Sequence, residues 1–294
     1  MTTTLIVLAA TMGNKYGGLK YLEGIGPNGE TILDYSIYDA VKVGFNKVVF
    51  VISKYFEKEF KQKVSGKYEN IVTVEYVYQE VEDVPEILRH PKRALLWGSA
   101  HAVLSGKGVI DGPFGVINAV NFYQRESFEL LYNTLQTLSE SPYQCFMVGY
   151  KLGNVIPEAG GANRGICEVD REGYLQSVTD RPGVERIGGH PMYLNEYNKG
   201  VNLNEDDCVS MNMWAGYPNF IDYLENGFKN FLLDESDDSL TKEYLLPIIV
   251  DQLIKTNRAS VKVLETTDKW FGVTYPEDKQ AVQDSIQELI HQGV

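Results

Sequence analysis

The 294-residue sequence predicts an α/β protein built on a mostly parallel β-sheet with helices packed on its faces. The first observation is a short apolar run at residues 5–10, without the polar alternation of a half-exposed strand, which is typical of a strand buried on both faces. The second is the helical spacing of apolar residues at 30–44. The third is that strands and helices alternate through the first half, which predicts right-handed crossovers between parallel strands.

The elements of the first half follow from local patterns. In residues 30–44, Leu33, Ile37 and Ala40 fall on one helical face, and Gly44 stands where a helix C-cap belongs. The same reasoning predicts strands at 47–53, 73–79, 114–120 and 144–151, and helices at 56–64, 98–104 and 126–138.

From residue 165 the pattern changes. The Glu172-Gly173 turn lies between strand-like segments 166–170 and 174–179, which predicts a hairpin. Further strands are expected at 209–215 and 261–265, and helices at 217–231, 241–254 and 277–290. Because no repeat, low-complexity segment or Gly/Ser linker interrupts the chain, we expect a single domain over 1–294 with a substrate-facing β subregion inserted in its second half.

Composition limits the classes of partner. A formal net charge of −13 argues against binding to a nucleic-acid backbone. With no apolar run of membrane-spanning length and no signal segment, we expect a cytoplasmic protein that does not bind membranes. The three cysteines and four histidines lack metal-ligand spacing, so free thiols are expected and zinc is not.

The loop after the first strand combines small residues with cations. Thr11 and Gly13 are followed by Lys15 and Lys20. Such a loop lets backbone N–H groups approach phosphates while lysines supply positive charge. A plain strand–turn in which glycines only permit positive φ explains the same residues. In an open α/β sheet, this loop and the loops after Gln79 and Val120 converge on one crevice at the carboxyl ends of the strands.

Several motifs taken together suggest a family. They are LAATMGNKYGGLK at 8–20, Gln79 at a strand end, GSAHA at 98–102, VINAVNFY at 116–123, RGICEVD at 164–170, DRP at 180–182 and WFGVTY at 270–275. This set resembles the sugar-phosphate nucleotidyltransferases (nucleoside-diphosphate-sugar pyrophosphorylases), most closely a bacterial branch with YGGLK and WFGVTY. The resemblance implies a Rossmann-like mixed, mostly parallel sheet. Residues 1–150 would form the nucleotide-binding half and residues 151–294 the sugar-phosphate-facing half.

The resemblance also implies a reaction. A sugar-1-phosphate oxygen would attack the α-phosphorus of a nucleoside triphosphate and release pyrophosphate, so catalysis would consist of positioning and charge neutralisation. Lys15 and Lys20 would be the catalytic cations. The nucleotide would be bound by Leu8, Ala10, Thr11, Met12, Gly13, Gln79, Gly98 and Ser99. Of these, Gln79 and Gly98 would read the base, the glycine because a side chain would block the approach of the base. The sugar phosphate, or another phosphate such as phosphocholine, would be bound by Gly149, Gly165, Asp180 and Arg181.

The sequence departs from the family pattern at positions that would bind phosphate and metal. Thr11 replaces a glycine of the phosphate loop, and Lys15 replaces an arginine with a bidentate fork. The turn that should carry adjacent aspartates for Mg²⁺ carries Val120 and Asn121, and a neutral amide oxygen is a weak ligand for a hard dication.

Two hypotheses follow from these departures. In one, the chain is a working transferase whose Mg²⁺ is held by Asn121, the phosphates and a carboxylate such as Asp278. In the other, it is a degenerate relative that binds a nucleotide or a protein partner without turnover.

Some conspicuous residues have simpler structural interpretations. His101 is expected to pack or to form a polar wall rather than act as a base. Trp214, Tyr217 and Phe220 are expected in the core, and Asp268-Lys269 is expected in a surface turn.

Overall fold

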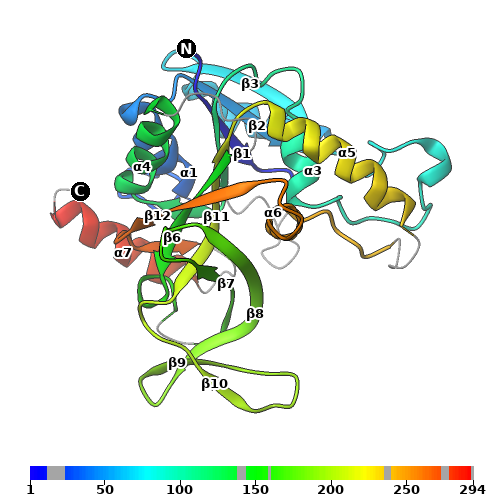
Figure 1. The fold of residues 1–294 in the computed structure, drawn as a ribbon. Coiled ribbons are helices and arrows are strands. Elements are labelled where there is room, and N and C mark those ends of the chain that lie inside the picture. Colours follow the sequence, from blue (N-terminus) through cyan, green and yellow to red (C-terminus); the bar gives the residue numbers. More distant parts are fainter. Residues whose placement is uncertain (12–23, 138–143, 158–159, 235–239, 273–277, 293–294) are drawn as a thin grey trace.

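Strands β1 (Thr4–Leu8) and β2 (Lys47–Ile52) lie inside an 11-stranded mixed sheet (Figure 1). The structure is a computed structural model, and it describes residues 1–11, 24–137, 144–157, 160–234, 240–272 and 278–292. Every side chain of β2 is buried, as expected for an apolar strand covered on both faces. The predicted α/β class, a Rossmann-like sheet flanked by helices, is confirmed.

The sheet changes character along its width. Its parallel part consists of β3 (Thr73–Tyr78), β2, β1 and β4 (Phe114–Asn118). Strand β11 (Cys208–Gly216) joins β4 in the antiparallel direction and continues the sheet. Beyond it follow β7 (Ala162–Val169), β8 (Leu175–Ile187), β9 (His190–Leu194) and β10 (Gly200–Asn202). Strand β6 (Gln144–Lys151) also pairs with β11, and β12 (Ser260–Thr266) runs parallel to β6.

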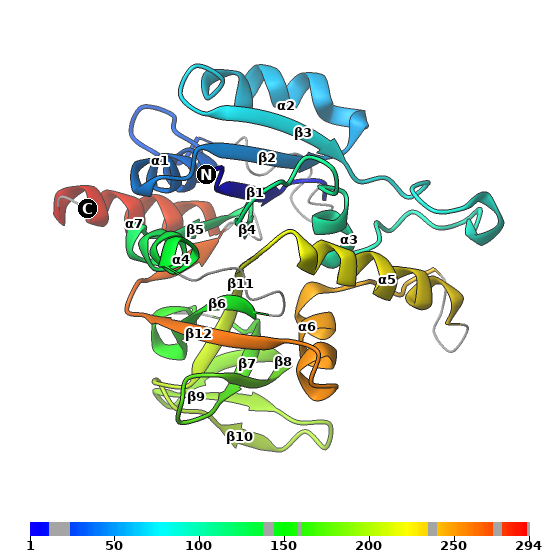
Figure 2. The ribbon, with the colours of Figure 1, turned by 45° about the horizontal axis from the view of Figure 1, so that its top comes forward.

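Helices cover both faces of this sheet (Figure 2). One core cluster contains side chains of α1 (Ile32–Val43), α2 (Glu57–Lys63) and α4 (Arg125–Thr137). The other contains side chains of α3 (Ser99–Leu104), α5 (Asn219–Leu233) and α6 (Leu246–Lys255). Short 3-10 turns occur at Lys54–Phe56, Ser65–Lys67, Glu86–Leu88 and Leu152–Asn154. In the part of the chain that the structure describes, no helix is long and apolar enough to cross a membrane.

Helix α1 shows how local sequence sets an element. Thr31 caps its first turn, and the side chain of Asp34 returns a hydrogen bond to the backbone of Thr31, which completes a capping box. At the other end, Gly44 has φ +123° and ends the helix, which confirms the predicted C-cap.

A smaller two-stranded sheet lies beside the main one. Strand β5 (Asn121–Tyr123) pairs with β13 (Trp270–Gly272), and the Phe122 and Phe271 rings stack at 4.6 Å. Helix α7 (Asp278–Gln292) packs Val282 and Ile286 against the hydrophobic cluster that contains these two rings. This sheet therefore ties the segment after β4 to the C-terminal helix.

The second half contains more β structure than the sequence predicted. The hairpin between β7 and β8 is confirmed, but β8 continues through residues 180–187, and β9 and β10 extend it into an arm that projects from the molecule (Figure 1). Trp214, Tyr217 and Phe220 are buried, as predicted.

Candidate functional site

The carboxyl ends of the parallel strands form one edge of the candidate site. Leu8 pairs with Asn118 where β1 and β4 end side by side, and Ala9 N donates to Val51 O of β2 at 2.9 Å. Ala10 is buried and Thr11 is exposed. The remaining residues predicted for this loop lie outside the described residues: Met12, Gly13, Lys15 and Lys20.

Two residues predicted to read the base are joined to each other. Gln79 follows β3, and its backbone N–H donates to Ile52 O at 2.9 Å. Its side chain is buried, and Nε2 donates to Gly98 O at 2.8 Å. The structure therefore brings Gln79 and Gly98 together across the turn before α3, as one shared wall.

The structure gives Gly98 a structural role of its own. Its φ is +95°, and a Cβ there would lie 2.7 Å from Tyr244 O and 2.9 Å from Tyr244 N. The Tyr244 segment runs closely past it, because Tyr244 N donates to Trp97 O at 2.7 Å and Ala100 N donates to Tyr244 O at 2.9 Å. The sequence interpretation assigned this glycine to room for a base, whereas this packing already requires it.

The neighbouring polar residues of α3 serve the interior. Ser99 Oγ accepts the Leu246 N–H at 2.9 Å and so supports the start of α6. His101 is buried against the Phe228 ring, with centroids 4.6 Å apart. Burial lowers the pKa of His101 to about 4, so its imidazole is neutral near pH 7. This agrees with the packing role predicted for His101.

The predicted sugar-phosphate residues fall in one row across neighbouring strands. Ser210 of β11 pairs with Gly149 of β6 on one side and with Gly165 of β7 on the other. Gly165 in turn pairs with Asp180 of β8. Residues far apart in sequence therefore become lateral neighbours. At both glycines, neighbouring side chains fill the place of a Cβ: Val263 and Cys208 at Gly149, and Val178 and Ser210 at Gly165.

A cationic side chain stands next to this row. Arg181 follows Asp180, and its guanidinium lies over the Tyr193 ring at 5.0 Å. Arg164, which pairs with Arg181 across β7 and β8, is buried and donates to Asn163 O at 2.8 Å and to Val155 O. Burial lowers the pKa of Arg164 to about 10. The Arg181 guanidinium is the half-buried one of the two, within reach of an anionic ligand.

Two asparagines that the sequence interpretation missed connect the row to the strand ends. β11 bulges after Ser210, and Asn212 there has φ +62°. Asn212 Nδ2 donates to Asn118 Oδ1 at 3.0 Å, while Asn212 Oδ1 accepts the indole N–H of Trp214 at 3.0 Å. An asparagine inside the otherwise apolar run 209–215 was the available signal, because asparagine is uncommon in strands and tolerant of positive φ.

The turn predicted to bind a metal, at Val120 and Asn121, carries no carboxylate. Val120 packs against the core, and a Cβ at Gly272 would lie 2.3 Å from Asn121 Nδ2, so the amide of Asn121 covers the facing strand. Ser36 Oγ donates to Asn121 O at 3.4 Å. Among the described residues, no group of three His, Cys, Asp or Glu side chains could hold a metal ion. The side chain of Asp278 lies outside them, and Asn121 as a ligand stays a prediction.

The predicted surface segment at Asp268-Lys269 is confirmed for Lys269, which is exposed, whereas the side chain of Asp268 turns out to be held inside by hydrogen bonds. Its carboxylate is half-buried and accepts hydrogen bonds from Ser127 N and Ser127 Oγ, both at 2.8 Å, at the start of α4. Burial raises the pKa of Asp268 despite these bonds. Nearby, Lys269 N donates to Gln124 Oε1 at 2.7 Å, so both positions hold the β12–β13 connection on α4 and β5.

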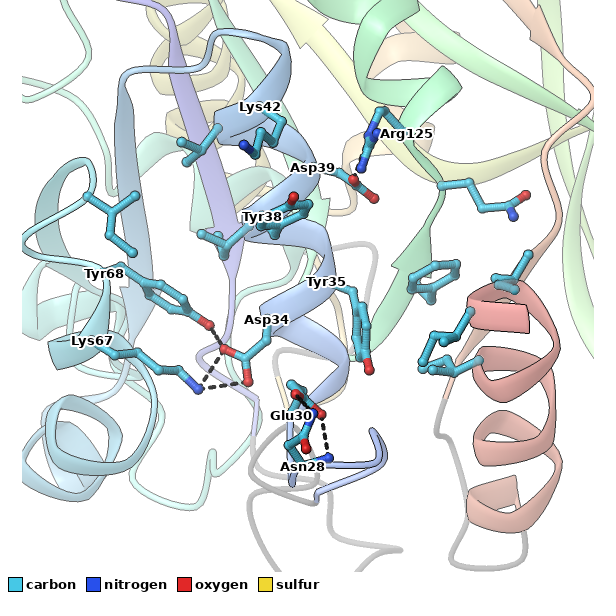
Figure 3. A pocket seen from close by; sticks show the side chains of 18 of the residues that line it. Asn28, Glu30, Asp34, Tyr35, Tyr38, Asp39, Lys42, Lys67, Tyr68 and Arg125 are labelled. Carbon is cyan, nitrogen blue, oxygen red and sulfur yellow. Dashed lines mark hydrogen bonds and ion pairs between the residues drawn. The ribbon is translucent and has the colours of Figure 1, made fainter. Parts of the chain in front are cut away.

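A cavity of about 840 Å³ lies away from the row, between α1, residues 67–71 and α7 (Figure 3). Its acidic side chains are paired within the wall: Asp34 with Lys67 and the Tyr68 hydroxyl, and Asp39 with Arg125 at 2.9 Å. None of the predicted site residues within the described part of the chain lines it.

Comparison with known proteins gives similar structures but no sequence relative. No family model matches the chain, and no curated protein matches it. The inositol-1-phosphate CTP transferase of T. maritima is similar with a TM-score of 0.60 and 14% identity, over 98% of this chain and 97% of that one. A Bacillus anthracis structure solved with sucrose, provisionally assigned as a glucose-1-phosphate thymidylyltransferase, gives 0.62 and 12%, over 97% and 95%. At these identities the likeness shows the fold.

Proposed function

We propose that this protein transfers a nucleoside monophosphate from a nucleoside triphosphate to a sugar-1-phosphate or a similar phosphate, with release of pyrophosphate. The observation that carries the proposal is the row Gly149–Ser210–Gly165–Asp180, linked by Asn212 and Asn118 to the strand ends where a triphosphate would bind. Two structures of the same fold are named for nucleotidyl transfer, one involving inositol-1-phosphate and the other glucose-1-phosphate.

The proposed reaction is an in-line displacement. A phosphate oxygen of the acceptor attacks the α-phosphorus, the bond to the β-phosphate oxygen breaks, and pyrophosphate leaves. The described residues contribute binding and orientation: Gln79 and Gly98 beside the base, the strands at Gly149 and Gly165 beside the acceptor, and Arg181 against its phosphate. Lys15 and Lys20 remain the proposed cations for the phosphates, on the motif alone.

The Asn118–Asn212 pair belongs in this proposal. Asn118 accepts from Asn212 through Oδ1, which leaves the amide nitrogen of Asn118 as a donor that this bond does not use. An amide at this position suits the hydroxyl groups of a sugar. Replacing Asn212 with glycine keeps the positive φ accessible and removes the amide, together with the acceptor of the Trp214 indole N–H. We expect about a tenfold higher KM for the acceptor with little change for the nucleotide.

The decisive assay is pyrophosphate release from a panel of nucleoside triphosphates and sugar-1-phosphates with Mg²⁺. Release that depends on both substrates supports the proposal, and the preferred pair would identify base and sugar. Folded protein that stays silent over the whole panel contradicts it. The Asn212→Gly variant then locates the acceptor. A KM that rises for the acceptor and stays unchanged for the nucleotide would place the acceptor beside the row.

A second candidate, a nucleotide-binding protein without turnover, is favoured by one observation. Val120 and Asn121 face the core and Gly272, so this turn presents no carboxylate where the resemblance implies Mg²⁺. Calorimetric titration of nucleoside triphosphates with and without Mg²⁺ separates the candidates. Binding that requires Mg²⁺ supports the transferase, whereas binding indifferent to Mg²⁺ supports the second candidate. Restoring Thr11→Gly, Val120→Asp and Asn121→Asp together should then raise turnover.

A further inference from the structure

Two of the three cysteines face each other across neighbouring strands. Val209 pairs with Ile166 and Ser210 with Gly165, so the same antiparallel register sets Cys208 opposite Cys167. Opposed residues in such a pair have Cα atoms about 4.5 or 5.5 Å apart and side chains on the same face. A disulfide spans Cα separations of about 4.4–6.8 Å. Both residues are free thiols, and their side chains lie within hydrogen-bonding reach of each other.

The two thiols differ in acidity. The contact with the Cys167 thiol lowers the pKa of Cys208, although burial and the negative charges of Glu265 and Asp207 oppose it. The same contact, with burial, raises the pKa of Cys167 well above its usual range. Cys208 is also the less buried of the two, so it is the thiol that ionises first and reacts first.

The pair lies against the glycines of the row. A Cβ at residue 149 would lie 2.8 Å from Cys208 Sγ, so this sulfur packs directly on Gly149. Cys167 Sγ donates to Gly165 O at 3.4 Å. The two sulfur atoms therefore contact the two glycines that we assign to the acceptor. The third cysteine, Cys145, is deeply buried on β6 and makes no such contact among the described residues; burial raises its pKa to about 12.

We propose that Cys167 and Cys208 are a site of reversible disulfide formation driven by a hydroperoxide. The Cys208 thiolate attacks one peroxide oxygen, the O–O bond breaks, and a sulfenic acid forms at Cys208 while the other oxygen leaves as water or an alcohol. The Cys167 sulfur then attacks the Cys208 sulfur and releases the second oxygen as water. The two thiols lose two electrons and two protons, which the peroxide accepts.

The disulfide changes the contacts of the row. An S–S bond of about 2.05 Å draws each sulfur toward the other, which removes the Cys167 hydrogen bond to Gly165 O and shifts Cys208 Sγ away from Gly149. The consequence for acceptor binding rests on the proposed function, whereas formation of the bond does not.

Tryptic mapping after peroxide treatment tests the site directly. The three cysteines fall in three different tryptic peptides, 126–151, 165–171 and 200–229. Folded protein treated with hydrogen peroxide should lose two of its three thiols and yield a crosslink of 165–171 to 200–229 that dithiothreitol reverses. The same treatment in urea is the control, because an unfolded chain also links 126–151.

Three variants make the test specific. Cys145→Ser should keep the crosslink, while Cys167→Ser and Cys208→Ser should each abolish it. Single oxidised cysteines without a crosslink, or crosslinks to 126–151 in folded protein, would overturn the proposal. In an active Cys145→Ser enzyme, oxidation should raise the acceptor KM several-fold and dithiothreitol should restore it, while an unchanged KM would overturn the coupling to the row. If the enzyme assay is silent, the proposed function falls but the peptide map still decides on the disulfide.

Discussion

Replacing Gly98 with alanine would test whether packing or nucleotide access requires the glycine. The alanine Cβ meets two obstacles: a backbone at φ +95° that favours glycine, and the Tyr244 backbone at 2.7–2.9 Å. Gly108 provides a matched control, since its φ is +94° and nothing lies within 4 Å of its Cβ position. The two substitutions share the strain and the change in unfolded-chain entropy, so their difference isolates the contact with Tyr244.

The expected magnitudes follow from these contacts. Positive φ costs alanine about 1–2 kcal/mol, which Gly108→Ala should show by itself. Gly98→Ala must in addition displace backbone and weaken the Tyr244 N–H bond to Trp97 O, so we expect a further ~2 kcal/mol or more. A difference of about 2 kcal/mol corresponds to roughly 4 °C in Tm for a protein of this size.

Urea unfolding and thermal melting of the two variants, each beside the unmodified protein, measure this difference. Nucleotide titration of Gly98→Ala supplies the functional arm. Equal destabilisation of both variants would refute the assignment of Gly98 to packing against Tyr244. If Gly98→Ala then lost nucleotide binding while being no less stable than Gly108→Ala, room for the base would be the reason for the glycine.

The remaining predictions concern stability. For His101, the folded pKa of about 4 lies below the usual 6.5, so the unfolded chain binds more protons between these values. The free energy of unfolding should fall as pH drops from 6.5 to 4, by at most about 3 kcal/mol. The His101→Gln variant should show a flatter plot of urea midpoint against pH over this range, and an unchanged plot would count against a neutral buried His101. For Asp268 the folded pKa is raised, so stability should fall as pH rises from the usual value of 3.8 through the folded pKa. The Asp268→Asn variant should not show that fall. The Asp268→Ala variant should be about 1 kcal/mol less stable, because it loses the hydrogen bonds from Ser127. Gly149→Ala, whose Cβ would lie 2.6 Å from Val263 Cγ1, should cost about 1–3 kcal/mol, and Val263→Ala in the same chain should recover part of it; a double-mutant cycle with no coupling would show that the contact is unimportant.

Local patterns carried much of the fold. Three kinds of element could be predicted because each depends on residues close together in the sequence. They are the apolar runs of β1 and β2, the apolar face and Gly44 cap of α1, and the turn between β7 and β8. The extension of β8 and the strands β9 and β10 were not readable, since Pro182, Gly183 and Pro191 interrupt the strand pattern and the pairing depends on partners supplied by the rest of the sheet.

The sequence by itself determined the order of strands and helices, the polar loops after β1, β3 and β4, and the motif set that singled out Gly149, Gly165 and Asp180. Only the tertiary structure decided that these three lie in one row beside Ser210, because strand register is a long-range property that no local periodicity specifies. The same holds for the Asn118–Asn212 bond, the Tyr244 backbone against Gly98, and the Cys167–Cys208 pair. Each depends on which distant strand or loop becomes a neighbour, and that is determined by how the whole chain buries its apolar faces.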